Sequence, residues 1–320
     1  MTTLVSANIV TGFLGSGKTT LLKSALKKDL GGKKIALIVN DFGEIGVDGT
    51  VLQGVNVDRL IELPNGCVCC TVGTQFSLAV QEIVETVQPH LIVIETSGVA
   101  DPAPLISELS LVGVKTDSVI TVVDAENGIR FCRENETAAR QVEAADFLVI
   151  NKIDLVSPGD LGRLSKRLRK LNPRAMLIPA AYGEVSEEIL FATGVTGYWK
   201  RASSHDPLEH THIEPHLEKD RITSFSFRKE GRLDRVSFER LLGRLPDRIY
   251  RAKGIVHFTG EGWSSLFNYT CGRARIDWLA PASEEIFLNR GVFIGKDLDR
   301  MAEKVLWEIR QCLTIGGNQI

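Results

Sequence analysis

The chain has 320 residues, of which 43% are apolar and 24% are charged. At roughly 150 residues per domain this length predicts about two domains, and the composition is that of a folded protein rather than a disordered one. Its 38 basic and 40 acidic side chains leave a formal charge of −2, whereas a domain dedicated to nucleic acid is usually strongly basic. We therefore expect no nucleic-acid partner.

Neither a membrane span nor a secretion signal is expected. No stretch approaches the roughly 20 consecutive apolar residues that a transmembrane helix requires, and the first residues lack the charged region and cleavage site of a signal peptide. Three of the six cysteines lie within four positions and the others are scattered, which is not the spacing of a disulfide framework. These features predict a cytoplasmic protein in a reducing compartment.

The first part of the chain alternates short β-branched runs with amphipathic segments. Helices are expected over residues 18–30 and 160–171, the second with its leucines on one stripe. Because the intervening runs are almost continuously apolar, we expect strands buried on both faces, in a largely parallel sheet covered by helices. The predicted strands are residues 4–10, 34–40, 58–63, 91–95, 118–124, 147–151 and 176–179.

Residues 201–220 interrupt this alternation and predict a linker, because they are polar and contain two prolines. Four of the six histidines lie there: His205, His210, His212 and His216. Beyond the linker, alternating and helix-spaced apolar residues predict a small α+β domain. The predicted organisation is therefore an α/β domain over 1–200, a linker over 201–220 and an α+β domain over 221–320.

The run from Gly12 to Thr19, GFLGSGKT, matches the phosphate-binding pattern G-x-x-x-x-G-K-[ST]. Gly12, Gly15 and Gly17 let the backbone curl so that consecutive N–H groups point at phosphate oxygens, and the following helix adds the positive end of its dipole. Lys18 supplies a mobile charge for the β- and γ-phosphates, and the Thr19 hydroxyl is placed to bind Mg²⁺. A predicted strand before the run and a predicted helix after it provide the required context.

The sequence Asn151-Lys152-Ile153-Asp154 follows a predicted buried strand, at the end where ligands dock on open α/β sheets. A carboxylate such as that of Asp154 can accept from both N1–H and the N2 amine of guanine, whereas adenine has an acceptor at N1 and no amine. Adenine would leave the carboxylate unpaired, a mismatch that is discriminated by roughly 10⁴-fold. The motif therefore favours a guanine nucleotide.

Glu95 and Gly98 belong to the run Glu-Thr-Ser-Gly that closes the predicted strand over residues 91–95. The Glu95 carboxylate can hold a water molecule bound to Mg²⁺. Gly98 permits a close approach to the γ-phosphate, so that its N–H can sense whether this phosphate is present. The alternative is an ordinary polar strand end at a loop.

Three thiols crowd a short loop predicted between a strand and a helix, in the run from Glu62 to Thr71. Cys67, Cys69 and Cys70 can converge on one soft cation, which points to Zn²⁺ or Co²⁺, because Mg²⁺ and Ca²⁺ prefer oxygen ligands. Three sulfur ligands leave a fourth position for a carboxylate, a water molecule or a partner protein, and this openness suits metal transfer better than storage. Redox-active thiols and buried structural cysteines are the alternatives.

Taken together, these motifs resemble those of the CobW-like GTP-binding metallochaperones, a family of P-loop GTPases. The resemblance is carried by GFLGSGKTT, by the C-x-C-C core GCVCC, by Glu-Thr-Ser-Gly followed by Ala-Asp-Pro, and by NKID. It spans residues 5–190, and in the C-terminal part Arg251-Ala252-Lys253-Gly254 is similar to the second domain of the family. It implies an α/β P-loop GTPase domain with a mostly parallel sheet flanked by helices, plus a smaller CobW-type C-terminal α+β domain.

By that resemblance, contacts are assigned residue by residue. The phosphates are bound by Gly12, Gly15, Ser16, Gly17, Lys18, Thr19 and Thr20, and the guanine base by Asn151, Lys152 and Asp154. The transition metal is bound by Cys67, Cys69 and Cys70, with Glu44 as a further candidate ligand, and Mg²⁺ by Thr19 and Glu95. The catalytic candidates are Lys18, Glu95 and Asp41, the last helping to position the attacking water.

The sequence departs from the family's pattern at two places. Asp41 lies in the segment Asn40–Glu44, which is similar to the first switch of the family, where Glu with its longer reach is more frequent. Many members carry a long His-rich tract, whereas this chain has only the four histidines between residues 205 and 216. A solvated linker is the favoured interpretation of these histidines, and accessory metal capture is the alternative.

The predicted function is that of a GTP-hydrolysing metallochaperone that delivers Zn²⁺ or Co²⁺ to a client metalloprotein under nucleotide control, with GTP and Mg²⁺ as cofactors and a homodimer as one expectation. Intrinsic hydrolysis is expected to be slow, because the motifs contain no arginine finger. Two alternatives come from other classes: an assembly chaperone with structural thiolates, and a thiol redox switch without metal. An ATPase is disfavoured by Asp154.

Overall fold

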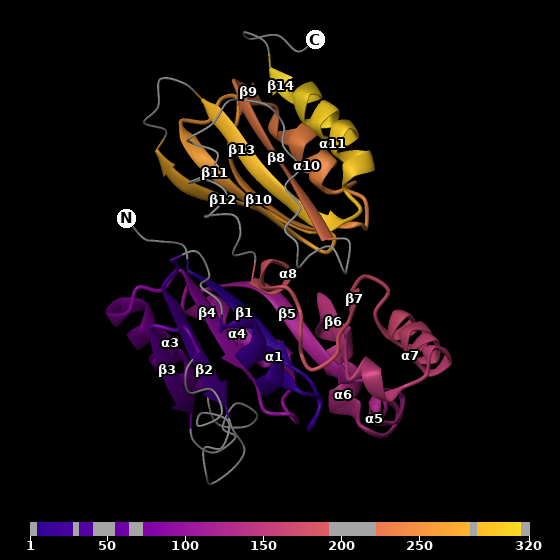
Figure 1. The fold of residues 1–320 in the computed structure, drawn as a ribbon. Coiled ribbons are helices and arrows are strands. Elements are labelled where there is room, and N and C mark those ends of the chain that lie inside the picture. The colour runs from indigo at the N-terminus through magenta and orange to yellow at the C-terminus, as the bar shows by residue number, and fades with distance from the viewer. Residues whose placement is uncertain are drawn as a thin grey trace. The chain divides into compact units, whose positions relative to one another are not determined.

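The computed structural model describes residues 5–27, 32–40, 55–63, 73–191, 222–281 and 287–314. The chain divides into two compact units, Met1–Phe191 and Ala192–Ile320, and each unit has its own sheet and helices (Figure 1). The predicted linker and its boundaries fall mostly on residues 192–221, which lie outside the described ranges. That division therefore stays a prediction.

Seven parallel strands form the sheet of the first unit, in the order β3-β2-β4-β1-β5-β6-β7. Every residue of β4 and β6 is buried, as expected for apolar strands covered on both faces. The parallel sheet is thus confirmed, and the predicted ends differ from the observed ones by no more than a few residues. The strands are β1 (Ser6–Thr11), β2 (Ile35–Asn40), β3 (Arg59–Leu63), β4 (Leu91–Glu95), β5 (Lys115–Asp124), β6 (Phe147–Asn151) and β7 (Met176–Pro179).

Helices of the first unit pack their apolar stripes onto this sheet. The helix predicted over residues 18–30 ends at Ala25, and the one predicted over 160–171 begins two residues earlier, because Ser157 caps it and Pro158 suits its first turn. Among the described residues, no helix is long and apolar enough to cross a membrane. The helices are α1 (Lys18–Ala25), α3 (Gly73–Thr86), α4 (Pro102–Leu111), α5 (Gly128–Glu134), α6 (Glu136–Ala144), a 3-10 turn η1 (Ile153–Leu155), α7 (Pro158–Leu171) and α8 (Glu187–Phe191).

The second unit is an antiparallel sheet in the order β12-β11-β10-β13-β8, with α10 and α11 packed on one face (Figure 1). Phe225 and Phe227, two positions apart and therefore on the same face of their strand, are both buried in the core between this sheet and the helices. The α+β class of this part is confirmed. Its elements are β8 (Ile222–Glu230), β9 (Arg232–Leu233), α10 (Arg235–Leu242), β10 (Ile249–His257), β11 (Trp263–Thr270), β12 (Arg273–Pro281), β13 (Leu288–Lys296), α11 (Asp299–Gln311) and β14 (Leu313–Thr314).

Candidate nucleotide-binding site

The loop between β1 and α1 has a backbone that only glycine tolerates at its two ends. Gly12 has φ +138°, and a Cβ there would lie 2.2 Å from the carbonyl oxygen of Val122 on β5. Gly17 has φ +102°, and a Cβ there would lie 2.3 Å from Nδ2 of Asn151. Both glycines are therefore fixed by close approach as well as by backbone conformation. The loop has the tight curl that the phosphate-binding pattern predicts.

Polar groups of this loop are arranged to receive an anion. The Lys18 ammonium donates a hydrogen bond to the carbonyl oxygen of Gly12 at 3.0 Å, which folds the side chain back along the loop. The hydroxyl of Ser16 is buried and has no hydrogen-bond partner among the described residues. Thr20 follows in the first turn of α1 and is exposed. A buried hydroxyl without a partner costs free energy that a phosphate oxygen would recover.

Thr19 and Glu95 bring two side-chain oxygens together at the carboxyl edge of the sheet. The Thr19 hydroxyl donates to Oε1 of Glu95 at 3.0 Å, and Glu95 is only 2% exposed. The pair forms because β1 and β4 are parallel neighbours, with Val10 opposite Glu95, so that the loop after β1 meets the end of β4. Oxygen donors of this kind fit Mg²⁺, which prefers carboxylates, hydroxyls and water.

Asn151 joins two loops at the end of β6. Its side-chain Nδ2 donates to the carbonyl oxygen of Ser16 at 3.0 Å, and its Oδ1 accepts from the N–H of Gly183 at 2.9 Å. Gly183 has φ +69°, and a Cβ there would lie 2.8 Å from the backbone nitrogen of Leu21 in α1. Asn151 therefore fixes the phosphate loop and the loop after β7 against each other. A contact of Asn151 with guanine stays a prediction.

Lys152 has a partner that the sequence analysis did not single out. Its ammonium lies 2.8 Å from Oδ2 of Asp124, a buried carboxylate at the end of β5. Asp124 is opposite Asn151 in the register of β5 and β6, and this adjacency of two strand ends is the signal that could have found it. Asp154 lies in η1 and is exposed, and its contact with a guanine base stays a prediction.

Several hydrogen-bond donors stabilise the ionised form of the Asp124 carboxylate. Burial alone raises the pKa of this carboxyl, but the hydrogen bond from Lys152 and those from the N–H groups of Asn127 and Glu126 outweigh it, so that its pKa lies below the usual range. The carboxylate is therefore ionised near neutral pH and keeps the Lys152 ammonium at the edge of the sheet where Asp154 also lies.

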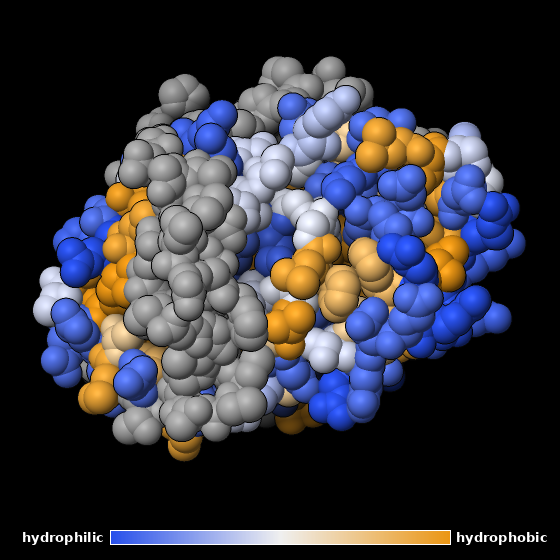
Figure 2. All heavy atoms as spheres, turned by 90° about the horizontal axis from the view of Figure 1, so that it is seen from below, coloured by the Kyte–Doolittle hydropathy of each residue, from blue (hydrophilic) through white to orange (hydrophobic). Residues whose placement is uncertain are grey.

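Gly98 lies directly on the phosphate loop. A Cβ at this position would be 2.7 Å from the backbone nitrogen of Leu14 and 2.6 Å from its side chain. In the space-filling view from below, apolar side chains lie among hydrophilic ones (Figure 2). Among the described residues, exposed large apolar side chains follow four of the parallel strands, namely Leu14, Val99, Leu155 and Tyr182.

Several predicted site residues lie outside the described ranges. These are Asp41 and Glu44, the thiols Cys67, Cys69 and Cys70, and the four histidines from His205 to His216. Among the residues that are described, no group of three or more His, Cys, Asp or Glu side chains is arranged to hold a metal ion. The predicted thiolate site thus stays a prediction from the sequence.

The sequence matches two protein-family models. Residues 6–179 match the model described as "CobW/HypB/UreG, nucleotide-binding domain". The chain belongs to the CobW/HypB/UreG family. Residues 222–313 of this family member also match the model described as "Cobalamin synthesis protein cobW C-terminal domain", so the family covers both units. The resemblance drawn from the motifs is confirmed, and the chain is a P-loop GTPase of the CobW class.

Curated relatives of this CobW-family chain carry related names. It is 34% identical to the "Zinc chaperone CobW" of Sinorhizobium sp over 85% of this chain and 86% of that protein. It is 30% identical to the "Zinc chaperone YjiA" of Escherichia coli over 92% and 95% of the two chains. It is also 35% identical to the "Zinc-regulated GTPase metalloprotein activator 1" of Schizosaccharomyces pombe over 57% and 47%.

Proposed function

We propose that this CobW-family GTPase binds zinc on the Cys67–Cys70 loop and hands it to a client metalloprotein under the control of GTP. The observation that carries the nucleotide part is the 3.0 Å contact between Thr19 and Glu95 beside the phosphate loop, in a chain of this family. The names of the zinc-chaperone relatives support the metal part. Metal supply implies a client that needs the metal.

The described residues divide the nucleotide chemistry among them. Lys18 would exchange the Gly12 carbonyl for β- and γ-phosphate oxygens, since both are acceptors within reach of the loop. Thr19 and Glu95 would hold Mg²⁺, directly or through water, and this ion supplies charge neutralisation at the phosphates. Lys152 and Asp154 would bind the guanine, with Asn151 holding the neighbouring loops in place. Asp41 is proposed to position the attacking water.

The thiolate loop is proposed as the carrier of the cargo. Cys67, Cys69 and Cys70 offer the sulfur ligands that Zn²⁺ prefers, and Glu44 is proposed as a fourth. Co²⁺ is compatible with the same donors, so a competition titration of the two metals decides which one the loop selects. In this proposal the Glu44 carboxylate is the ligand that a side chain of the client displaces when the metal is transferred.

Nucleotide and metal are proposed to be coupled through the Asp41–Glu44 segment and the thiolate loop, both of which follow strands that end at the nucleotide edge of the sheet. Any such coupling is reciprocal, because two ligands that affect each other's equilibrium affinity do so by the same factor. GTP that strengthens zinc binding must therefore itself bind more tightly in the presence of zinc. A homodimer is also part of the proposal, and sedimentation of the full chain tests it.

A zinc titration of the full chain tests the proposal. We expect one high-affinity Zn²⁺ per chain whose affinity changes at least fivefold, about 1 kcal/mol, when a non-hydrolysable GTP analogue is bound. Replacing Cys67, Cys69 and Cys70 by Ser should abolish it, whereas Cys271→Ser, outside the loop, should not. Equal zinc affinities with and without the analogue would contradict the coupling. Client activation that survives the triple substitution would favour the assembly chaperone, and a reversible disulfide without bound metal would favour the redox switch.

A further inference from the structure

Gln141, on α6, is a buried polar side chain to which the nucleotide chemistry above assigns no role. It is 1% exposed, and its amide nitrogen donates to two backbone carbonyl oxygens, that of Ala100 at 2.9 Å and that of Gly98 at 3.3 Å. Because a carbonyl oxygen only accepts, the carboxamide must present its NH₂ group to both. The two hydrogens of one nitrogen thus hold one turn of the loop after β4.

The loop that Gln141 holds is the one that lies on the phosphate loop. Its turn is closed by a hydrogen bond from the N–H of Ala100 to the carbonyl oxygen of Ser97 at 3.1 Å. On its other side, Gly98 approaches the backbone nitrogen of Leu14 so closely that a Cβ would lie 2.7 Å away. Gln141 and the phosphate loop therefore flank the same short segment, one through its carbonyl oxygens and the other through direct packing.

The same helix holds this segment at a second point. Arg140 donates to the Asp101 carboxylate at 3.3 Å, and Asp101 caps α4 by accepting from the N–H of Ala103. Arg140 is exposed, so this contact is screened by water and contributes little. Gln141 is buried, so its hydrogen bonds meet no competition from water.

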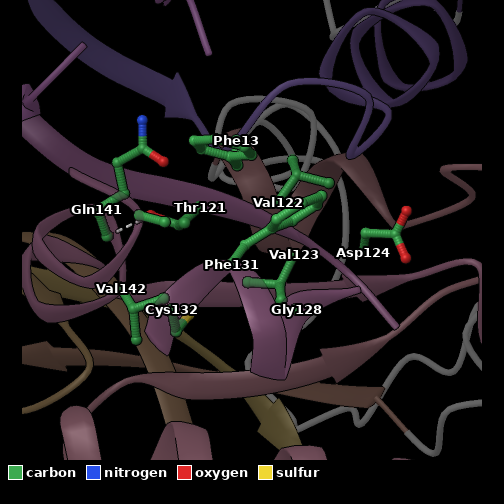
Figure 3. Close-up of a pocket in the computed structure, with 11 residues that line it drawn as sticks. Phe13, Thr121, Val122, Val123, Asp124, Gly128, Phe131, Cys132, Gln141 and Val142 are labelled. Atoms are coloured by element: carbon green, nitrogen blue, oxygen red, sulfur yellow. Dashed lines mark hydrogen bonds between the residues drawn. The ribbon is translucent and has the colours of Figure 1, made fainter. Parts of the chain in front are cut away.

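Gln141 is itself attached to the sheet through its backbone. Its backbone carbonyl oxygen accepts from the hydroxyl of Thr121 on β5 at 2.7 Å, the dashed line in Figure 3. Its side chain extends toward Phe13 of the phosphate loop, beside a cavity of about 20 Å³ that is lined by Phe131 and Cys132 as well (Figure 3). The sheet therefore holds Gln141, and Gln141 holds the loop.

We propose that Gln141 is a positioning residue for recognition of the γ-phosphate: it fixes the loop from Gly98 to Ala100 against the phosphate loop before nucleotide arrives. This inference rests on the proposed function, because it assumes that the Gly98 N–H meets a γ-phosphate. A loop held in place loses less conformational entropy when the phosphate binds. GDP has no γ-phosphate, so the contribution of Gln141 should appear for GTP and not for GDP.

Nucleotide titrations of the full chain test the proposal, with GDP and a non-hydrolysable GTP analogue as probes, each with Mg²⁺. Gln141→Met keeps the length of the side chain and removes both donors, because its sulfur and methyl group replace the amide carbon and nitrogen. We expect the affinity for the GTP analogue to fall about tenfold, the loss of about two net hydrogen bonds, and that for GDP to change less than about twofold. Equal losses for both nucleotides, or no loss, would overturn the inference.

Arg140→Met is the matched control, since it removes the exposed contact of the same helix with Asp101 without touching the carboxamide. It should leave the ratio of the two affinities unchanged, and a shift as large as that of Gln141→Met would overturn the inference. A wild-type chain that binds neither nucleotide would contradict the proposed function, and with it this role. A wild type that binds both, with a ratio that Gln141→Met leaves unchanged, would contradict this role alone.

Gln141→Glu provides a second test if the methionine variant folds poorly. An ionised carboxylate cannot donate to the two carbonyl oxygens, whereas a protonated one can, and burial favours the protonated form by raising the pKa of the carboxyl. Relative to wild type, the loss of affinity for the GTP analogue should therefore shrink as the pH is lowered from 8 toward 6. A loss that does not depend on pH would contradict a donor role.

Discussion

At the scale of single residues, the site depends on polar side chains that tie one loop to another. Asn151 bonds the phosphate loop on one side and the Gly183 loop on the other, and Thr96 links the ends of β4 and β1 through the hydroxyl of Thr11 at 2.8 Å. Each of these contacts is buried, so that losing one partner would leave the other without a hydrogen bond in a place that water does not reach. Such residues hold the loops of the site in place.

The ionisation of Asp124 makes the stability of the folded chain depend on pH. Because its pKa is lowered in the folded chain, the ionised carboxylate stabilises the fold at every pH above the pKa of the unfolded chain, and this stabilisation is lost as the pH falls through the folded value. Asp124→Asn should cost about 1–3 kcal/mol of unfolding free energy at pH 7. The difference between variant and wild type should hold down to about pH 4, shrink as the pH falls further, and vanish only below the lowered pKa of the folded chain.

Urea unfolding at a series of pH values measures this difference. A difference that grows on acidification would contradict the assignment, because it would mean that the folded state binds the proton more tightly than the unfolded one. Lys152→Met is the companion variant, since it removes the partner charge and leaves the two backbone hydrogen bonds to Asp124 in place.

At the scale of elements, α7 shows how sequence signals set a helix. Ser157 accepts from the N–H of Asp160 at 3.1 Å and caps the first turn, and Pro158 occupies a position where its missing N–H costs nothing. Leu164 and Leu168 are fully buried against the sheet. The basic side chains of this helix lie on the other side, and Arg163, for example, pairs with Asp160. These basic side chains therefore form the solvent-exposed face of α7.

Burial rather than residue type should decide the cost of a leucine substitution. Leu168 is 0% exposed in α7, whereas Leu111 is 79% exposed at the end of α4. Leu168→Ala should cost about 2–5 kcal/mol through lost contacts and a cavity, and Leu111→Ala should change stability by less than about 0.5 kcal/mol. Denaturant unfolding followed by circular dichroism compares the two, and similar costs would contradict the burial of Leu168.

At the scale of the whole molecule, each unit has its own buried apolar clusters. The first unit has one cluster around β1, β2 and β4 and another around β5 and β6 that includes Cys132, and the cluster of the second unit fills the space between the antiparallel sheet and its helices and includes Cys312. Burial raises the pKa of the Cys132 thiol, and it raises the pKa of the Cys312 thiol to about 11. Each thiol therefore reports on the opening of its own unit.

Labelling of the Cys132 and Cys312 thiols can follow the unfolding of each unit separately. At pH 8 both thiols should stay unlabelled in the native protein, because a buried thiol of raised pKa forms almost no thiolate. Each should become reactive in urea only when its own unit unfolds, as followed by mass spectrometry of the labelled peptides. Cys271, which is partly exposed, serves as the internal comparison. Rapid native labelling of Cys132 or Cys312 would contradict the burial of that thiol.

Motifs made of contiguous residues were predictable, because their chemistry is local. The phosphate loop, the run Asn151–Asp154 and the strand ends at Glu95 could all be located from residue type and spacing. The function of the thiolate run follows from the same reasoning and awaits the zinc titration. Gln141 was not predicted, because no motif includes it, and Asp124 was not predicted, because its partner Lys152 follows the adjacent strand rather than its own.

The sequence by itself thus determined the class of nucleotide site, the parallel sheet of the first unit, the α+β class of the second and the family, since glycine spacing, strand hydrophobicity and motif order are properties of the chain alone. Only the tertiary structure decided which side chains support that site. Gln141 lies 41 residues from Ala100 and Asp124 lies 28 residues from Lys152 along the chain. Such partners meet only because the parallel strands bring distant parts of the chain together. Burial then strengthens each of these hydrogen bonds, because water does not compete for the donors and acceptors.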